Sequence, residues 1–133
     1  MSATDYARNQ ILNYNFGSAA YSVPGTFHVG LSTTTISSSG SNATEPSGAS
    51  YARVSVTNNK TNFTYAASGC LVNATEIAFA ESTGSWGTIV DVGIWDHTSS
   101  GSVWYFTSLP TSKVIQDTTT VSFSASALSI SMT

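Results

Sequence analysis

Charged residues are scarce in this chain. Asp, Glu, Lys and Arg make up 8% of its 133 residues, and the formal net charge is -3. The four fixed cations, Arg8, Arg53, Lys60 and Lys113, are spread along the sequence and form no cluster. Proteins that bind nucleic acids through phosphate contacts carry clustered Lys and Arg side chains. We therefore expect no nucleic-acid partner.

Cysteine and long apolar runs are also lacking. Cys70 is the single cysteine, so no disulfide can form within the chain, and we expect its side chain to be buried as a small apolar group. No apolar run approaches the roughly 20 residues that span a bilayer, and the polar residues 1–5 contain no apolar signal segment. We expect a protein that is made in a cytoplasm and does not insert into membranes.

Residues that carry catalytic chemistry are equally few. The sequence holds two histidines, His28 and His97, and lacks a Gly-x-Ser-x-Gly motif, metal-ligand spacings and a glycine-rich phosphate loop. Asp91 and Asp96 are close in sequence, but their odd offset places them on opposite faces of a strand, unlike a glycosidase pair. We expect Asp91 to face solvent and Asp96 to form a turn. The chain is therefore predicted to be no enzyme, with no catalytic residue, metal or cofactor.

Hydrophobic residues, by contrast, reach 41%, and their strongest pattern lies in residues 84–96. Val90, Val92 and Ile94 share one parity and should enter a core together. A turn at 96–101 then leads to a second strand at 103–107. Further along, Leu109-Pro110 predicts a strand stop, since proline cannot donate to a ladder. This hairpin is predicted to form the centre of the fold.

One helix is expected, at residues 4–15. Thr4 or Asp5 can cap its start, and Ala7, Ile11 and Tyr14 follow helical spacing. The sequence Asn15-Phe16-Gly17 should end it, because glycine accepts the left-handed position after a helix. We favour packing of this helix on its own domain over a role at a neighbouring subunit.

The remaining sequence reads as short strands separated by turns. Residues 26–32 and 51–56 alternate clearly, and residues 35–50 form a long polar loop that should lie on the surface. Many short strands at spacings of roughly 8 to 12 residues are typical of all-β folds. We predict one domain, 1–133, folded as an antiparallel β-sandwich of jelly-roll or Ig-like type with one short N-terminal helix.

The three tryptophans allow two interpretations. Exposed aromatic rings on a β-sandwich could stack on sugars, which would make the chain a carbohydrate-binding domain. The alternative is that Trp86 and Trp104 fill the core or a contact between subunits, because aromatic residues supply much of the apolar burial of small sheets. We favour the second interpretation, since large exposed apolar patches are rare unless they are functional.

The order of several motifs resembles small structural proteins of tailed-phage virions, often labelled tail-fibre-like, whose β-domains are similar to those that decorate phage heads. The resemblance covers nearly the whole chain. The motifs that carry it are Glu45-Pro46-x-Gly48, Tyr51-Ala52-Arg53-Val54, Asn73-Ala74 with Ile77-x-Phe79, Ser85-Trp86-Gly87-Thr88, Gly93-Ile94-Trp95-Asp96, Leu109-x-x-x-Lys113-Val114 and Val121-Ser122-Phe123.

The resemblance implies a non-enzymatic virion protein that is made in the bacterial host and displayed on the particle exterior. We expect a capsid decoration (cement) protein, with a tail-fibre or tail-tip module that contacts a host glycan or protein as the alternative. A free carbohydrate-binding domain is the third hypothesis. Partners would be major capsid or tail proteins and further copies of the chain, for example in a trimer. The expected interaction surface comprises the helix, the long loop and outward hairpin aromatics: Tyr6, Ile11, Tyr14, Ile36, Glu45, Trp95 and Trp104.

Overall fold

The computed structural model describes residues 1–17 and 20–132. Within them the chain forms nine strands and one helix, which confirms the predicted all-β fold with a short N-terminal helix. In chain order the elements are β1 (Ser2–Ala3), α1 (Asp5–Asn15), β2 (Thr26–Ser32), β3 (Val54–Thr57), β4 (Cys70–Val72), β5 (Ile77–Ala78), β6 (Gly87–Trp95), β7 (Val103–Ile115), β8 (Ser122–Phe123) and β9 (Ser129–Ser131).

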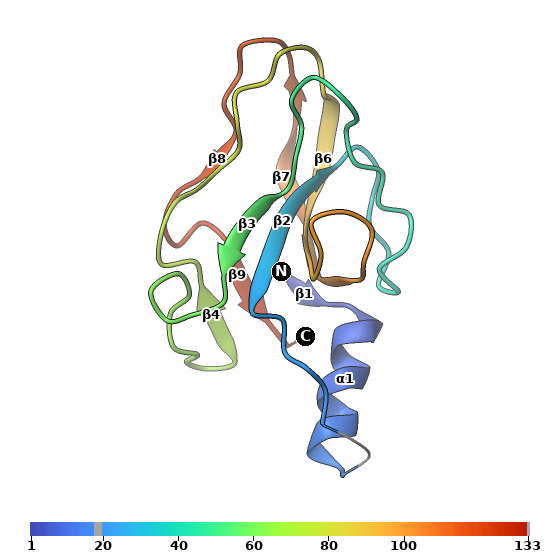
Figure 1. The fold of residues 1–133 in the computed structure, drawn as a ribbon, viewed down its shortest axis with the longest axis vertical. Helices are drawn as coiled ribbons and strands as arrows, with labels where there is room; N and C mark the ends of the chain where they lie inside the picture. Colours follow the sequence, from blue (N-terminus) through green and yellow to red (C-terminus); the bar gives the residue numbers. More distant parts are fainter. Residues whose placement is uncertain (18–19, 133) are drawn as a thin grey trace.

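A five-stranded antiparallel sheet forms the main layer, in the order β1-β7-β6-β2-β3 (Figure 1). The predicted hairpin, β6 and β7, lies at its centre, and β2 pairs with β6 from His28–Trp95 to Ser32–Asp91. The short β1 pairs with β7 through Ser2–Phe106 and Ala3–Tyr105. The start of the chain is therefore bound to the longest strand before the helix begins.

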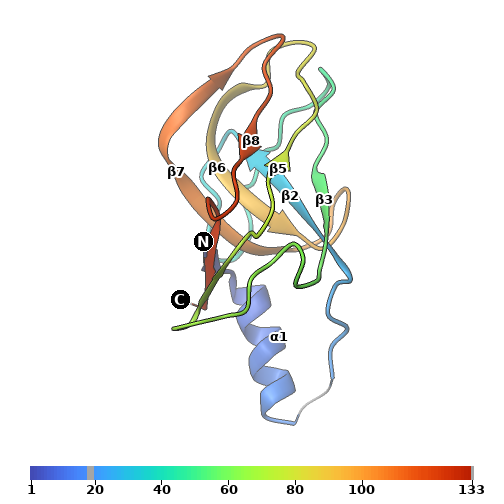
Figure 2. The ribbon, with the colours of Figure 1, turned by 90° about the vertical axis from the view of Figure 1, so that its left-hand side faces the viewer.

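Two small ladders, β4–β9 and β5–β8, form the second layer (Figure 2). The main core lies between these ladders and one face of the large sheet, as in a sandwich, although the second layer is divided into two parts. The buried residues of this core are Val29, Leu31, Val56, Phe63, Ile77, Phe79, Trp86, Ile89, Val92, Ile94, Ile115 and Leu128. Trp86 is among them and donates its indole N–H to the Ala49 carbonyl at 2.9 Å, so its expected role as a structural anchor is confirmed.

The opposite face of the large sheet is covered too. Gly30 and Gly93 are cross-strand partners at the centre of the sheet, and the Trp95 ring lies against both. A Cβ at Gly30 would come within 2.8 Å of this ring, and a Cβ at Gly93 within 2.7 Å. Ile36, from the long loop, packs beside Trp95 and is 1% exposed. The two glycines therefore form a notch that receives a tryptophan, and β2 and β6 are buried on both faces.

A bulge changes the predicted alternation of β6. Ile89 pairs with Lys113 and Asp91 with Ser108, so Val90 alone stands opposite residues 109–112. Because of this irregularity Ile89, rather than Val90, enters the core with Val92 and Ile94. The predicted strand stop at Leu109-Pro110 is wrong, since β7 continues to Ile115. Pro110 is tolerated because it lies in the bulge, where no ladder hydrogen bond is required of it.

The helix begins and ends as the sequence predicts. The Thr4 side chain accepts a hydrogen bond from the Ala7 N–H at 3.2 Å, and Phe16 follows the last helical residue. Gly17 then adopts a left-handed φ of 78°, which costs glycine little. The helix extends from one end of the β-domain (Figure 1) and contacts β7 and β1. Within residues 1–17 and 20–132, no helix is long and apolar enough to cross a membrane.

Candidate interaction surface beside the helix

An aromatic cluster joins the helix to the sheet. The Tyr6 ring meets the Trp104 ring edge-on at a centroid distance of 5.5 Å, and Tyr21 and Phe27 approach Trp104 at 5.8 and 5.9 Å. Tyr21 also touches Tyr14, at 5.7 Å. Trp104 stands at a second irregularity of the β6–β7 ladder, where Ile94 pairs with Tyr105 and Trp95 with Val103. The extra residue directs Trp104 toward the helix, where it is buried at 4% exposure.

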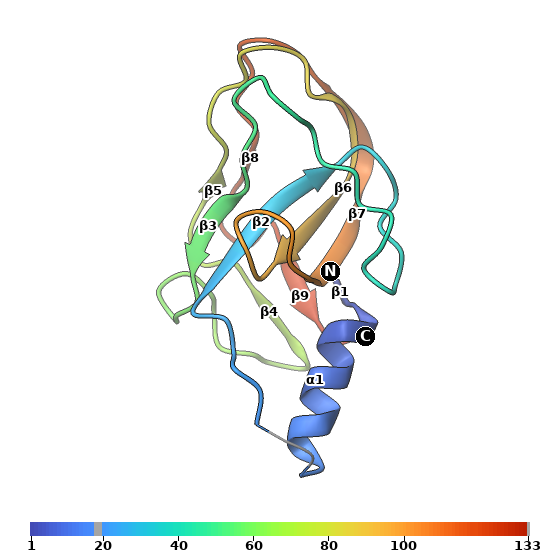
Figure 3. The ribbon, with the colours of Figure 1, turned by 45° about the vertical axis from the view of Figure 1, so that its right-hand side comes forward.

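A groove of about 360 Å³ opens over this cluster. It lies between α1, the segment that follows the helix and the 96–102 turn, which Figure 3 shows above the helix. We call it the aromatic groove. Its lining residues are Tyr6, Gln10, Tyr21, Ser22, Pro24, Asp96, His97 and Trp104.

Asp96 is the most firmly held polar group of the aromatic groove. Its Oδ1 accepts hydrogen bonds from the Ser102 N–H at 2.8 Å and meets His97 Nδ1 at 2.6 Å, and its Oδ2 accepts from the Trp104 indole N–H at 3.2 Å. Partial burial opposes ionisation, but these bonds from His97, Ser102 and Trp104 outweigh it and lower the pKa of Asp96. The expected turn role of Asp96 is confirmed, and its carboxylate is fixed in place.

Large exposed apolar side chains continue along the helix and beyond it. Phe16 is 84% exposed, and Leu12, Tyr14 and Val23 are each more than half exposed. Ile11 is half-buried on the same helix. Three of the seven predicted interaction residues, Tyr6, Ile11 and Tyr14, therefore belong to this helix, and the Trp104 ring meets the Tyr6 ring edge-on.

The other four predicted residues are buried or half-buried. We expected Ile36 and Trp95 on the surface, and this prediction is wrong. Both residues are buried in one cluster with Val103. The reason is the glycine notch. Because its two glycines have no side chains, the Trp95 ring can lie against the sheet, and Ile36 of the loop packs beside it. Trp104 is likewise buried, so neither tryptophan of the hairpin is an outward aromatic.

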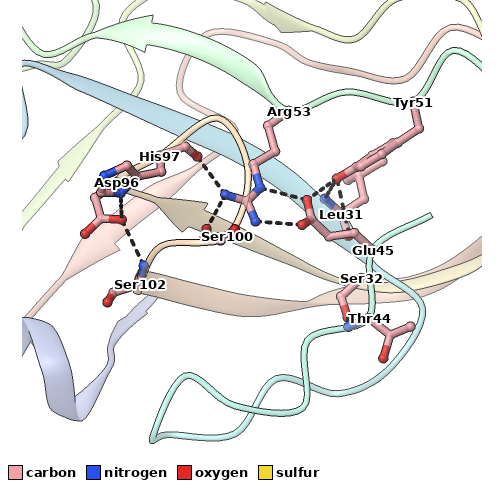
Figure 4. Close-up of polar contacts among 10 residues, drawn as sticks. All are labelled: Leu31, Ser32, Thr44, Glu45, Tyr51, Arg53, Asp96, His97, Ser100 and Ser102. Atoms are coloured by element: carbon pink, nitrogen blue, oxygen red, sulfur yellow. Dashed lines mark hydrogen bonds and ion pairs between the residues drawn. The ribbon is translucent and has the colours of Figure 1, made fainter. Parts of the chain in front are cut away.

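Glu45 is half-buried in a polar network around Arg53 (Figure 4). Arg53 binds both carboxylate oxygens of Glu45, at 2.9 and 2.7 Å, and donates to the carbonyls of His97 and Ser100 at 2.6 and 2.8 Å. The Tyr51 hydroxyl donates to Glu45 Oε1 at 2.8 Å and accepts from the Leu31 N–H. Burial raises the pKa of Tyr51 far above its usual range. Through Arg53, this network links Glu45 of the long loop to the backbone of the 96–102 turn. Glu45 therefore stabilises the fold.

Two further expectations about exposure are wrong. Asp91 is 1% exposed rather than solvent-facing, and its Oδ2 accepts a hydrogen bond from the Ile36 N–H at 2.7 Å. The covering loop, which no strand periodicity reveals, buries this face of β6. Cys70 is exposed rather than buried, because it begins the short peripheral strand β4.

A second groove, of about 580 Å³, lies between the far half of β7 and residues 119–123. Leu109, Val114, Val121 and Phe123 give it apolar walls, and Val114 is 61% exposed. Beyond Phe106, β7 pairs with β6 alone among the described strands, so its outer edge is open there. The assumed stop at Pro110 hid this groove from sequence analysis. We call it the β7 groove.

The described residues of the two grooves do not form a metal-binding cluster. Across residues 1–17 and 20–132, no three His, Cys, Asp or Glu side chains gather closely enough to hold a metal ion. The carboxylates of Asp91, Glu45 and Asp96 are each engaged in hydrogen bonds within the fold. Aromatic, apolar and hydroxyl side chains make up most of the lining of both grooves.

Comparison with known proteins identifies the family of the chain. Curated protein sequences give no match to the chain. The model of one protein family, described as podophage GP4 fiber I protein gp80, matches residues 2–131. The predicted resemblance to phage virion structural proteins is confirmed by this match, which spans nearly the whole fold. The chain belongs to the podophage GP4 fiber I protein gp80 family.

Proposed function

We propose that this chain is a non-enzymatic fibre component on the exterior of a podophage virion, where it contacts the host surface. The observation that carries the proposal is the family match over residues 2–131. The word fiber in the family description favours the tail-fibre alternative of the sequence analysis over capsid decoration. Exterior display and host contact go beyond the match and rest on the surfaces described above.

The distribution of polar and apolar groups supports a structural rather than a catalytic role. Asp91, Glu45 and Arg53 are used to fasten loops to the sheet, and they do not converge on an open cleft. Apolar side chains are instead exposed on the helix and along the β7 groove, among other places. Exposed apolar patches of this kind mark sites of contact with other molecules.

We assign the β7 groove to contact between copies of this chain in a closed homo-oligomer, for example a trimer. An open strand edge beside apolar walls favours pairing with another chain. Lys113 is the one charged residue of the lining, so a low-charge chain such as this one would bury little charge there. Val114→Asp should shift the chain toward monomers in light scattering, whereas Tyr65→Ala, a change at an exposed ring outside the groove, should not.

Labelling of purified virions tests the fibre assignment. Gold-conjugated antibodies against the chain should mark the tail region, and antibodies against the major capsid protein should mark the head of the same particles. Quantitative mass spectrometry should give a copy number far below that of the major capsid protein. Labelling spread over the head, at a copy number close to that of the capsid protein, would show decoration instead.

A further inference from the structure

We propose that the aromatic groove binds one neutral sugar unit of a bacterial surface glycan. The proposal rests on the proposed function, because it supplies the chemistry by which a fibre component would contact a host. It depends on three features of the groove: aromatic walls, a fixed carboxylate and the absence of cations from the lining. Each is argued in turn below.

The walls of the groove offer apolar surface to a sugar ring. Tyr6 and Tyr21 each contact the Trp104 ring, and Tyr6 remains 37% exposed in spite of that contact. Aromatic side chains combine an apolar ring with a polar tip, which suits them to ligands that are apolar on one face and wet at the edge. A pyranose is such a ligand, since its C–H groups lie on the faces and its hydroxyls at the rim. Tyr6 and Tyr21 would contact the faces.

The carboxylate of Asp96 offers a hydrogen-bond acceptor to the hydroxyl groups at the edge of the sugar ring. Three groups of the protein hold it in one orientation, namely His97, the Ser102 N–H and the Trp104 indole. Its side chain is still 12% exposed, and Oδ2, which accepts the Trp104 indole N–H, can accept a further hydrogen bond from a ligand hydroxyl. A carboxylate that is already fixed loses little entropy on binding. Asp96 is therefore the group that would orient the sugar.

Further polar groups stand beside this carboxylate. The His97 ring donates to Asp96 through Nδ1 and is 68% exposed, so its Nε2 is available to a ligand, as an acceptor when the ring is neutral. Gln10 lines the groove from α1 and carries both a donor and an acceptor in its amide. Sugar hydroxyls donate and accept at the same time, and they match such a mixed set better than an apolar ligand would.

Charge and size narrow the ligand class. No Lys or Arg is among the lining residues, and the one carboxylate is ionised at neutral pH. An acidic sugar would therefore meet a negative group without a compensating cation. The volume of about 360 Å³ lies at the lower end of the roughly 300–1,000 Å³ of small-molecule sites, which suits one sugar unit rather than a long chain. The groove thus favours a neutral hexose or N-acetylhexosamine over a uronic or sialic acid.

Nuclear magnetic resonance titration of the purified chain tests the proposal. Galactose, glucose, mannose and N-acetylglucosamine serve as probes, and glucuronic acid is the acidic comparison. At least one neutral sugar should cause saturable shifts of the Trp104 indole and Gln10 side-chain signals in the millimolar range, with glucuronic acid at least tenfold weaker. If no neutral sugar shifts these signals, or if glucuronic acid binds equally well, the proposal is wrong.

Variants assign the binding to the groove. Gln10→Ala and Tyr6→Ala should each weaken the best sugar by fivefold or more, while Tyr65→Ala, at a ring with 79% exposure outside the groove, should bind like the unchanged chain. Gln10→Ala guards against misfolding of the Tyr6 variant, because it removes no ring from the aromatic cluster. Undiminished binding by both groove variants would overturn the assignment. Virion labelling separates the two proposals: tail labelling without sugar binding refutes the sugar site alone, and absence from the tail refutes the fibre role.

Discussion

The Arg53 guanidinium lies 4.3 Å from the centre of the Trp95 ring while it binds both carboxylate oxygens of Glu45. One side chain therefore stacks on the tryptophan in the glycine notch, pairs with the long loop and donates to two carbonyls of the 96–102 turn. Its side chain is only 5% exposed. Arg53 therefore connects the long loop to the end of β6 and to the 96–102 turn.

Replacement of Arg53 should destabilise the fold strongly. Arg53→Ala would leave Glu45 half-buried without its cation, and we expect a loss of about 2–4 kcal/mol in the free energy of unfolding. Arg53→Lys keeps the charge but loses the planar fork, so it should cost about half as much. Urea unfolding followed by tryptophan fluorescence measures both. A loss below about 0.5 kcal/mol for Arg53→Ala, the range of ordinary surface changes, would contradict the structural role.

The glycine notch should not accept a methyl group. In Gly93→Ala the new Cβ would stand 2.7 Å from the Trp95 ring, which must then move, and such overpacking costs about 1–3 kcal/mol. Gly25→Ala is the matched control, because a Cβ there meets no atom within 4 Å. Thermal unfolding should show a lower midpoint for Gly93→Ala only. Equal midpoints for the two variants would mean that Trp95 does not fill the notch.

Variants of Asp91 test whether the stability of the fold depends on a hydrogen-bond acceptor for the Ile36 N–H or on the charge of the carboxylate. Asp91→Ala leaves the Ile36 N–H without its acceptor and should cost about 1–3 kcal/mol. Asp91→Asn retains an oxygen for that N–H and removes the charge, so its stability at pH 7 should equal or exceed that of the unchanged chain. Chemical denaturation of both variants decides the matter. An asparagine variant as unstable as the alanine variant would show that the charge itself is required.

His28 should make stability depend on pH. Burial, followed by the positive charge of Arg53, lowers the pKa of His28 below its ordinary value of 6.5, and Nδ1 lies 2.9 Å from Ser55 Oγ. As pH falls below 6.5, the unfolded chain takes up a proton that the folded chain resists, so stability should fall toward the folded pKa. Unfolding curves between pH 7.5 and pH 5 should reveal this slope. His28→Gln should flatten it, and an unchanged slope would assign the effect to another group.

The local patterns of the sequence predict local structure well. The helix cap at Thr4, the left-handed Gly17, β2 at Thr26–Ser32 and the β6–β7 hairpin follow from spacing and turn chemistry. What lay beyond prediction depends on contacts distant in sequence. The long loop has no periodicity, yet it buries Asp91 and its own Ile36. One irregularity of the β6–β7 ladder places Ile89 in the core instead of Val90, and the other directs Trp104 toward the helix.

The candidate surface could be anticipated from the sequence only in its helical part. Tyr6, Ile11 and Tyr14 were expected on it as residues of the helix, and of these Tyr6 lines the aromatic groove. Gln10, Tyr21, Asp96 and His97 belong to the aromatic groove, but they come from three segments that only the fold brings together. The sequence did show aromatic and turn residues at these positions. It gave no sign that residues 21–24 and 96–97 lie close together in the fold.

Burial of β2 and β6 on both faces has a consequence for hydrogen exchange. Solvent reaches the amides of Val29, Leu31 and Val92 only after the loop on one side or the ladders on the other have separated from the sheet. Such amides exchange through the largest opening that the molecule undergoes. Their exchange rates should therefore report the free energy of global unfolding, while those of α1 and β4 report local opening at the periphery.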